Sequence, residues 1–286
     1  MRPNPSPRSL VTRSNSGLSL ALVHCLRDRC VRNERGLFLA EGVRFLTRAV
    51  ETKWPIACVV VCPKLFSSPY GNHLVRQLVG EGIPRLKVSA PEFAALSGAL
   101  ESDEPRQGVL IVARQRWDPL PEIVLPQDLW LGLETIRSAG NHGTLLRTSE
   151  AVGVTRQLIF DRSSQGSHVG IDPFDPITVR ASMGSIFSQR FTRTTHRDFR
   201  AWKNNHPLRA FGATAEGELD YRQGRYLGSS LVMLGDERKG LSPGQLASCD
   251  HLIRIPMQGR PDSLNVAMAG AVLLYEAFGQ RNPLTQ

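Results

Sequence analysis

Apolar residues along the first part of the chain alternate between helical spacing and short continuous runs. Helical spacing is found over residues 18–31 and 41–50. The continuous apolar runs, which are typical of buried strands, lie at 36–40, 56–62 and 108–113. Ser89, followed by Pro91, suits the N-cap and first turn of a further helix. The pattern therefore predicts a small α/β domain over residues 17–113.

The alternation restarts after a stretch that prolines interrupt. Pro119, Pro121 and Pro126 break any regular spacing over residues 114–127, which is typical of a semi-rigid linker. Beyond the linker, strands are predicted at 128–133, 157–160, 208–212, 231–235 and 252–255, and helices from Asn141 and over 263–278. We therefore predict a second α/β domain, with a largely parallel sheet, over residues 128–281.

Positive charge is concentrated near the amino end of the chain. The 286 residues carry a formal net charge of +9 with a pI of about 9.8, and the first fifty hold nine arginines against three acidic residues. Nucleic acid is the favoured partner because its binding releases condensed counterions. The alternative is a basic surface that contacts only solvent. Residues 1–16 are predicted to form a disordered basic tail, with a transit peptide as the alternative.

The sequence argues against several other classes of protein. No apolar run reaches the ~20 residues that a membrane helix needs, and the five cysteines match neither a zinc site nor a secreted disulfide framework. We therefore expect a cytoplasmic protein with reduced thiols, no metal and no membrane partner. The chain also lacks a phosphate loop with a lysine and the motifs of dinucleotide-binding enzymes, serine hydrolases and zinc proteases.

Three segments of the second half end a predicted strand in a turn of glycine and polar residues, where open α/β sheets place ligands. They span 131–147, 231–242 and 253–267. In the first, Asn141 is predicted to cap a helix whose second turn carries Arg147, and both a helix N-terminus and a guanidinium favour an anion. A cap and turn without further function is the alternative. His142, beside this turn, is interpreted as a local hydrogen-bonding residue.

The other two segments allow backbone to approach a ligand closely. Glycines surround a carboxylate pair in 231–242, a pattern that also suits a plain tight turn. In the third segment an irregular loop precedes Ser263, which is predicted to begin a helix. That helix contains the small residues Ala267, Ala269, Gly270 and Ala271. Small residues permit close packing either within the chain or against a second subunit, and both alternatives stay open.

Together and in this order, the three segments resemble the signature of the SpoU (TrmH) branch of the SPOUT methyltransferases. The matching positions are Asn141-x-Gly143-x-x-x-Arg147, Leu234-Gly235-x-Glu237-x-x-Gly240-Leu-Ser242, and Ile255-Pro-Met257 followed by Ser263-Leu-Asn265-Val266. The stretch from Val179 to Gly184 also resembles this family, and the likeness covers 128–279. The amino half resembles the substrate-binding domain often fused to such enzymes, through residues 32–45.

The resemblance implies an S-adenosylmethionine-dependent methyltransferase that acts on a ribose 2′-hydroxyl of RNA. It implies an amino-terminal α/β domain, similar to ribosomal proteins, that binds RNA, and a carboxyl-terminal α/β domain with a deep trefoil knot. A homodimer follows by the same analogy. Ribosomal RNA is the favoured substrate. A transfer RNA 2′-O-methyltransferase, an enzyme acting on a base nitrogen and a non-catalytic RNA-binding dimer are the alternatives.

The resemblance also implies roles for individual residues. Arg147 is the main catalytic candidate, and because a guanidinium holds its proton tightly, stabilising the 2′-oxyanion suits it better than acting as a base. The remaining catalytic candidates are Asn141, Glu237, Ser263 and Asn265. Backbone groups around Leu234, Gly235, Ile255, Met257 and Leu264 are expected to hold the cofactor. Candidates for RNA binding are Arg32, Arg35, Arg44 and Arg180.

The sequence departs from the family pattern in two places. Ser138-Ala139 stands where Asp-Pro commonly precedes Gly-Asn, and Ala267 stands where serine often follows Ser-Leu-Asn-Val. Both departures weaken the assignment of the cofactor contacts. Neither changes a catalytic candidate, so the sequence predicts an active enzyme.

Overall fold

The computed structural model describes residues 18–97, 107–161, 170–259 and 263–283. Two units of the chain are defined by their internal contacts: Met1–Gln115 with Phe174–Phe187, and Arg116–Pro173 with Ser188–Gln286. The predicted basic tail, residues 1–16, lies outside the described residues. Residues 174–187 group with the first unit, although the sequence pattern had placed them within the second domain.

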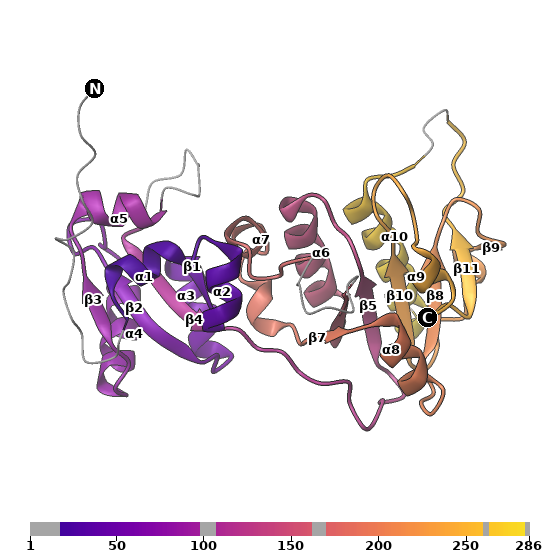
Figure 1. The fold of residues 1–286 in the computed structure, drawn as a ribbon, viewed down its shortest axis with the longest axis horizontal. Coiled ribbons are helices and arrows are strands. Elements are labelled where there is room, and N and C mark those ends of the chain that lie inside the picture. Colours follow the sequence, from indigo (N-terminus) through magenta and orange to yellow (C-terminus); the bar gives the residue numbers. More distant parts are fainter. Residues whose placement is uncertain (1–17, 98–106, 162–169, 260–262, 284–286) are drawn as a thin grey trace. The chain divides into compact units, whose positions relative to one another are not determined.

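The first unit is built on a four-stranded mixed sheet of order β1-β4-β2-β3 (Figure 1). Its strands are β1 (Leu37–Glu41), β2 (Ile56–Val61), β3 (Arg85–Lys87) and β4 (Val109–Arg114). Its helices are α1 (Leu20–Cys25), α2 (Arg29–Arg35), α3 (Val43–Glu51), α4 (Pro69–Gly80), α5 (Ala90–Ser97) and α7 (Pro176–Ala181). β4 runs antiparallel to both β1 and β2, whose continuous apolar residues are buried, as their sequence predicts.

The helix predicted over residues 18–31 is in fact two helices. The Asp28 carboxylate accepts hydrogen bonds from the backbone N–H groups of Cys30 (2.7 Å) and Val31 (3.3 Å), so it caps a new helix rather than continuing the first. The prediction of a helix at Ser89 is confirmed, because Ser89 and Glu92 exchange hydrogen bonds in a capping box.

The second unit contains a seven-stranded sheet of order β7-β6-β5-β10-β8-β11-β9 in which every neighbouring pair is parallel (Figure 1). The strands are β5 (Leu129–Leu133), β6 (Arg156–Phe160), β7 (Phe191–Thr194), β8 (Arg209–Ala213), β9 (Leu219–Asp220), β10 (Ser230–Leu234) and β11 (His251–Arg254). The helices are α6 (Ala139–Ala151), α8 (His196–Lys203), α9 (Pro243–Leu246) and α10 (Val266–Arg281). This confirms the prediction of a parallel α/β sheet. Short 3₁₀ helices cover Ser185–Ser188, in the first unit apart from Ser188, and Tyr221–Gln223.

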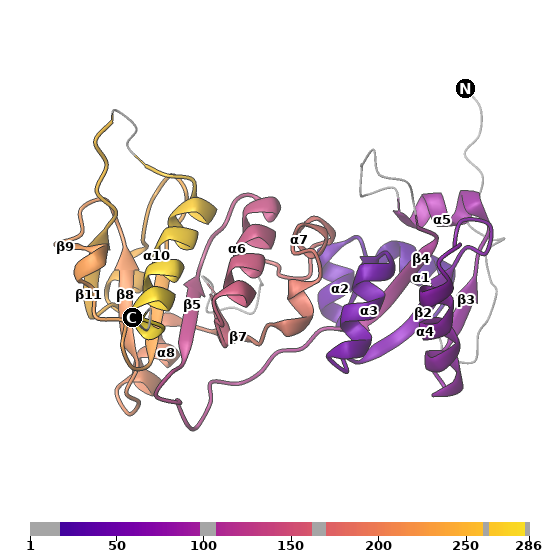
Figure 2. The ribbon, with the colours of Figure 1, turned by 180° about the vertical axis from the view of Figure 1, so that it is seen from behind.

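Strand β5 shows why the sheet is apolar on both faces. Leu129, Leu131 and Leu133 belong to a core that includes residues of α6 and α10, whereas Trp130 belongs to a second core with Phe199 of α8. Alternate residues of a strand point to opposite faces, so each face needs its own cover. Helices α6 and α10 lie side by side (Figure 1 and Figure 2).

Residues of the predicted linker contact side chains in and around β7 and α8 of the second unit. The Arg193 guanidinium lies 3.9 Å from the centre of the Trp117 ring, and Arg190 pairs with Asp118 at 2.9 Å. The Trp202 indole donates a hydrogen bond to the carbonyl of Pro121 (2.8 Å).

All five cysteines have free thiols. None of the described helices is both long and apolar enough to cross a membrane.

Candidate active site

The carboxyl ends of β5 and β10 bring two of the predicted segments together. Leu133 and Leu234, the last residues of these neighbouring parallel strands, are paired in register. The chain therefore leaves both strands at one edge of the sheet, which we call the carboxyl edge. Parallel α/β sheets bind ligands at this edge.

Three predicted site residues, Asn141, Glu237 and Asn265, are joined by hydrogen bonds at the carboxyl edge. The Asn265 amide donates to Oδ1 of Asn141 (3.2 Å), and the Asn141 amide donates to Oε1 of Glu237 (3.3 Å). The amide orientations follow from this network, since a carboxylate can only accept. These residues are up to 124 positions apart in the sequence. The structure therefore assembles a polar cluster from all three segments.

Local capping places the two asparagines, and it corrects two predictions. Helix α6 begins at Ala139 with Ser138 as its N-cap, so Asn141 is not the cap and its side chain can turn toward Glu237. Helix α10 begins at Val266 rather than at Ser263. Asn265 is its N-cap, accepting from the N–H groups of Ala267 (2.9 Å) and Met268 (3.4 Å).

Arg137 fixes the loop that carries Glu237, a role that no sequence motif indicated. Its backbone N–H donates to both carboxylate oxygens of Glu237 (3.1 and 3.0 Å), and its guanidinium pairs with Asp236 at 3.0 Å. Desolvation acts to raise the pKa of Asp236, but hydrogen bonds from the Arg238 and Lys239 backbone and from Arg137 outweigh it and hold that pKa below its ordinary value.

The loop itself closes tightly. Asp236 and Gly240 exchange two backbone hydrogen bonds of 2.9 Å. A Cβ atom on Gly235 would overlap the backbone of Gly240, so only glycine fits at this position. The loop is therefore a rigid support for Glu237.

Arg147 and Ser263 do not join the cluster within one chain. Arg147 is exposed on α6, six residues beyond Asn141 and therefore about 120° around the helix from it. Neither side chain makes a hydrogen bond or ion pair with the part of the chain that the structure describes. The structure thus brings together three of the five catalytic candidates.

The predicted cofactor residues lie around unpaired backbone at the same edge. Met257 and Leu264 are 38% and 42% exposed, and Ile255 is half-buried. Within the described residues, the backbone of 255–259 makes no hydrogen bond to other backbone. Exposed apolar side chains beside free backbone donors and acceptors fit an adenine ring and its polar edge.

Leu234 has a structural role at this edge, while its part in cofactor binding stays a prediction. Its side chain is buried, and its carbonyl already accepts a hydrogen bond from the Gln245 amide (2.9 Å). Leu234 therefore anchors the loop that follows it.

His142 is a buried residue of α6 that links this helix to the neighbouring strand β6. Its Nε2 lies 3.2 Å from Oε1 of Gln157, whose amide donates to the Ser149 hydroxyl (3.2 Å). Burial lowers the pKa of His142 to about 4. The imidazole is therefore neutral at physiological pH and acts as a hydrogen-bonding residue of the core.

The four predicted RNA-binding arginines lie in the first unit in different environments. Arg32 is buried, donates to the carbonyl oxygen of Leu26 (3.0 Å) and lies 3.7 Å from Asp175, so burial argues against its contacting RNA. Arg35 and Arg44 are exposed, and Arg180 is half-buried.

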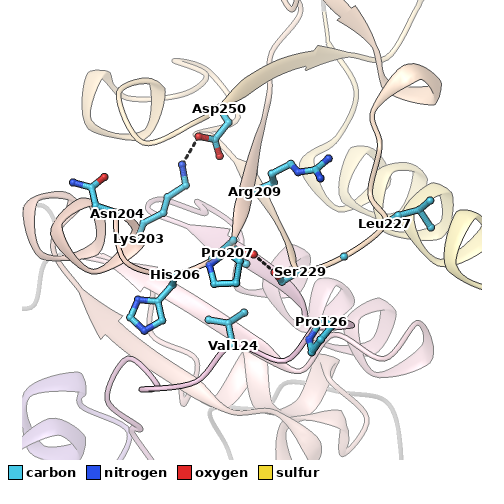
Figure 3. Close-up of a pocket in the computed structure, with 12 residues that line it drawn as sticks. Val124, Pro126, Lys203, Asn204, His206, Pro207, Arg209, Leu227, Ser229 and Asp250 are labelled. Atoms are coloured by element: carbon cyan, nitrogen blue, oxygen red, sulfur yellow. Dashed lines mark hydrogen bonds and ion pairs between the residues drawn. The ribbon is translucent and has the colours of Figure 1, made fainter.

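A cavity of about 590 Å³ lies at the opposite, amino edge of the seven-stranded sheet (Figure 3). Its lining consists of Val124, Pro126, Lys203, Asn204, His206, Pro207, Leu208, Arg209, Leu227, Gly228, Ser229 and Asp250. The Asp250 carboxylate pairs with Lys203 (2.5 Å) and accepts from the backbone N–H of Ala210 (2.8 Å). No predicted site residue lines this cavity. Among the described residues, no group of three or more His, Cys, Asp or Glu side chains could hold a metal ion.

Comparison with known proteins matches both halves of the chain to families. Residues 128–275 match the SpoU rRNA Methylase family, and residues 22–107 match the MRM3-like substrate binding domain. A 23S rRNA (uridine(2479)-2′-O)-methyltransferase from Streptomyces viridochromogenes is 30% identical over 90% of this chain and 87% of its own length. A tRNA (guanosine(18)-2′-O)-methyltransferase from Thermus thermophilus is 32% identical over 54% of this chain and 76% of its own.

A solved structure extends the likeness to the fold. The AdoMet-bound rRNA methyltransferase from Sinorhizobium meliloti superposes with a TM-score of 0.81 at 27% identity, covering 95% of this chain and 97% of that one. The likeness therefore includes both units of the chain.

Proposed function

The chain belongs to the SpoU rRNA methylase family, and from this premise we propose that it transfers the methyl group of S-adenosylmethionine to a ribose 2′-hydroxyl of 23S ribosomal RNA. The observation that carries the proposal is the hydrogen-bonded cluster of Asn141, Glu237 and Asn265 at the carboxyl edge. It joins the three sequence segments that distinguish this family, beside a surface that fits an adenine ring.

Ribosomal RNA is favoured over transfer RNA by the extent of the likeness. The 23S rRNA relative from S. viridochromogenes matches along 90% of the chain, whereas the tRNA relative from T. thermophilus matches 54%. The family match to a substrate-binding domain over 22–107 lies in the amino half. We assign RNA binding to this half, with exposed Arg35 and Arg44 among its contacts.

We assign cofactor binding to the backbone of 255–259, and the side chains of Met257 and Leu264 and the loop that begins at Gly235 would help to hold the cofactor. When bound, S-adenosylmethionine supplies an electrophilic methyl group on its sulfonium. The protein must orient the ribose hydroxyl toward that group, and fixed orientation supplies several kcal/mol of the barrier in such transfers. The cluster of Asn141, Glu237 and Asn265 holds the surrounding loops in place.

Arg147 is proposed to stabilise the developing 2′-oxyanion and to bind a neighbouring phosphate. A guanidinium keeps its proton and offers five donors, so it suits an electrostatic role better than that of a base. Because Arg147 points away from the cluster of its own chain, we propose that it completes the site of a second copy.

A homodimer is also supported by helix α10. Three of its small residues face inward: a Cβ on Gly270 would collide with Leu145, and Ala267 and Ala277 are buried, whereas Ala269 and Ala271 are partly exposed. The exposed face instead carries the large apolar side chains of Met268, Tyr275 and Phe278. Such a face on a helix that is apolar nearly all round fits burial against a second copy.

The remaining organisation follows the family. We propose that residues 17–113 form the RNA-binding domain, 114–127 the linker and 128–281 the catalytic domain, with the carboxyl-terminal segment threaded as a trefoil knot. We also propose that the protein acts in the cytoplasm.

The proposal is tested by incubating the purified protein with S-adenosylmethionine and ribosomal RNA from cells that lack it, followed by nuclease digestion and mass spectrometry. One new 2′-O-methylated nucleotide in 23S rRNA is expected. A methyl group on a base would identify the enzyme as a base methyltransferase. Absence of any methyl group, together with RNA binding, would identify a non-catalytic RNA-binding dimer.

A further inference from the structure

A buried carboxylate, Glu134, lies at the carboxyl edge and has no role in the cluster described above. It directly follows β5, so it sits beside Gly235, which follows β10. Only 6% of its surface is exposed. Its Oε2 accepts a hydrogen bond from the Ser242 hydroxyl and lies 3.1 Å from Nε2 of His196. A buried carboxylate is costly unless hydrogen-bonded in this way.

The two partners of Glu134 are themselves held in place. The His196 ring stacks on Phe160 at 4.4 Å, and a Cβ on Gly244 would collide with the His196 ring. Ser242 is the N-cap of α9: its hydroxyl accepts from the backbone N–H of Gln245 (3.2 Å) while donating to Glu134. The carboxylate therefore joins the ends of three segments that are distant in the sequence.

Glu134 and Glu237 each connect the segment after β5 to the loop after β10, and each of these two segments supplies one of the two carboxylates. Glu237, on the loop after β10, accepts from Arg137 and Asn141 on the segment after β5. Glu134, on the segment after β5, accepts from Ser242 at the far end of the loop after β10. The Gln245 side chain holds the two ends of that loop together. Its amide nitrogen donates to the Leu234 carbonyl, and its oxygen accepts from the backbone N–H of Ser242 (3.0 Å).

We propose that Glu134 is a positioning residue, which fixes loop 235–242 through Ser242 and thereby sets the backbone and the Glu237 carboxylate for cofactor binding. The inference rests on the proposed function, because it assigns the cofactor to this edge. Glu134 does not touch the ligand in this scheme. It acts through the Ser242 hydroxyl.

The test measures binding of S-adenosylhomocysteine by calorimetry, with thermal unfolding of each variant alongside. Glu134→Gln and Ser242→Ala are each expected to raise the Kd about tenfold, the effect of losing one hydrogen bond to a charged group. Ser242→Thr keeps the hydroxyl and is expected to bind like the wild type. The double variant Glu134→Gln/Ser242→Ala is expected to bind no more weakly than Ser242→Ala alone, because Glu134→Gln weakens the same bond whose donor Ser242→Ala removes.

Asp250→Asn is the matched control, since it neutralises a hydrogen-bonded carboxylate at the amino edge of the same sheet. It is expected to lower the Tm without changing the Kd. An unchanged Kd in both Glu134→Gln and Ser242→Ala, an equal loss in Ser242→Thr, or additive losses in the double variant would overturn the role of Glu134. A wild-type protein that binds no S-adenosylhomocysteine would instead overturn the proposed function, and this role with it.

Discussion

The two edges of the seven-stranded sheet use their polar side chains differently. At the carboxyl edge, Asn141, Glu237 and Asn265 join loops that are far apart in the sequence, beside exposed apolar side chains. At the amino edge, the polar groups of the 590 Å³ cavity hold their own surroundings together. Asp250 pairs with Lys203 and the backbone of β8, and the Ser229 hydroxyl donates to the Pro207 carbonyl (Figure 3).

The cavity at the amino edge is therefore not the better candidate site. A pocket is usually the first place to look for a ligand, but a ligand needs groups that the protein has not already satisfied. At the carboxyl edge the backbone of 255–259 offers such groups, and side chains from distant loops converge there. The following variants test this contrast.

Replacing Arg147 has the largest expected effect. Arg147→Ala should lower kcat about 100- to 1,000-fold, as the loss of one preorganised donor does in other enzymes, and should leave the Kd for S-adenosylhomocysteine unchanged. Single-turnover methyl transfer and calorimetry measure the two quantities. Arg209→Ala, which removes a guanidinium at the amino edge, should keep full activity. Undiminished turnover in Arg147→Ala would contradict the role assigned to it.

Separating the two copies should have nearly the same effect, because Arg147 is then removed from the site it completes. Tyr275, on α10, is 54% exposed, and Tyr275→Glu would bury a charge in the proposed interface. A monomer by light scattering with about 100-fold lower turnover is expected. Leu227→Glu, at the rim of the amino-edge cavity, should stay dimeric and active. A wild-type protein that is monomeric and fully active would rule out the shared site.

Acid should destabilise the second unit through His142. Burial lowers its pKa to about 4, against 6.5 when unfolded, so between these values the unfolded chain binds the extra proton. The unfolding free energy should therefore fall as the pH drops from 6.5 to 4, by about 3 kcal/mol from this residue. Denaturant unfolding at several pH values measures the slope. His142→Gln should lose that contribution, and an unchanged slope would show that His142 is not the cause.

Removing Glu237 should have the smallest of these effects. Glu237→Ala leaves Asn141 and the Arg137 N–H without their acceptor, which costs about 2 kcal/mol and should weaken cofactor binding about 30-fold. Asp250→Ala, the matched carboxylate at the amino edge, should leave the affinity unchanged. Equal losses of affinity in the two variants would mean that the two edges do not differ in function.

The sequence predicted the sheet of the second unit where strands are central and failed where they are peripheral. β5 and β10 are continuous apolar runs because both faces are buried. β7, at the sheet's edge, reads Phe-Thr-Arg-Thr, and α8 buries only Phe199, so neither carries a strong apolar pattern. Helix α4 was not predicted, although Pro69 fits the first turn of a helix and Ser68 caps it.

The site was predictable only where side chains carry the function. Asn141, Glu237 and Asn265 could be singled out because the motifs that contain them resemble the family signature. Arg137 could not, because its bond to Glu237 comes from a backbone N–H that almost any residue offers. The helix starts were predicted two or three residues away from their true positions. Ser138 rather than Asn141 caps α6, and Asn265 rather than Ser263 caps α10, because serine and asparagine are equally good N-cap residues.

Hydrogen exchange with and without S-adenosylmethionine tests most directly which edge of the sheet binds the ligand. Slower exchange is expected in the amides of 235–240, 255–259 and 264–268, with no change in 203–209 or 226–230. Protection confined to the cavity-lining segments 203–209 and 226–230 would contradict the assignment of the active site to the carboxyl edge.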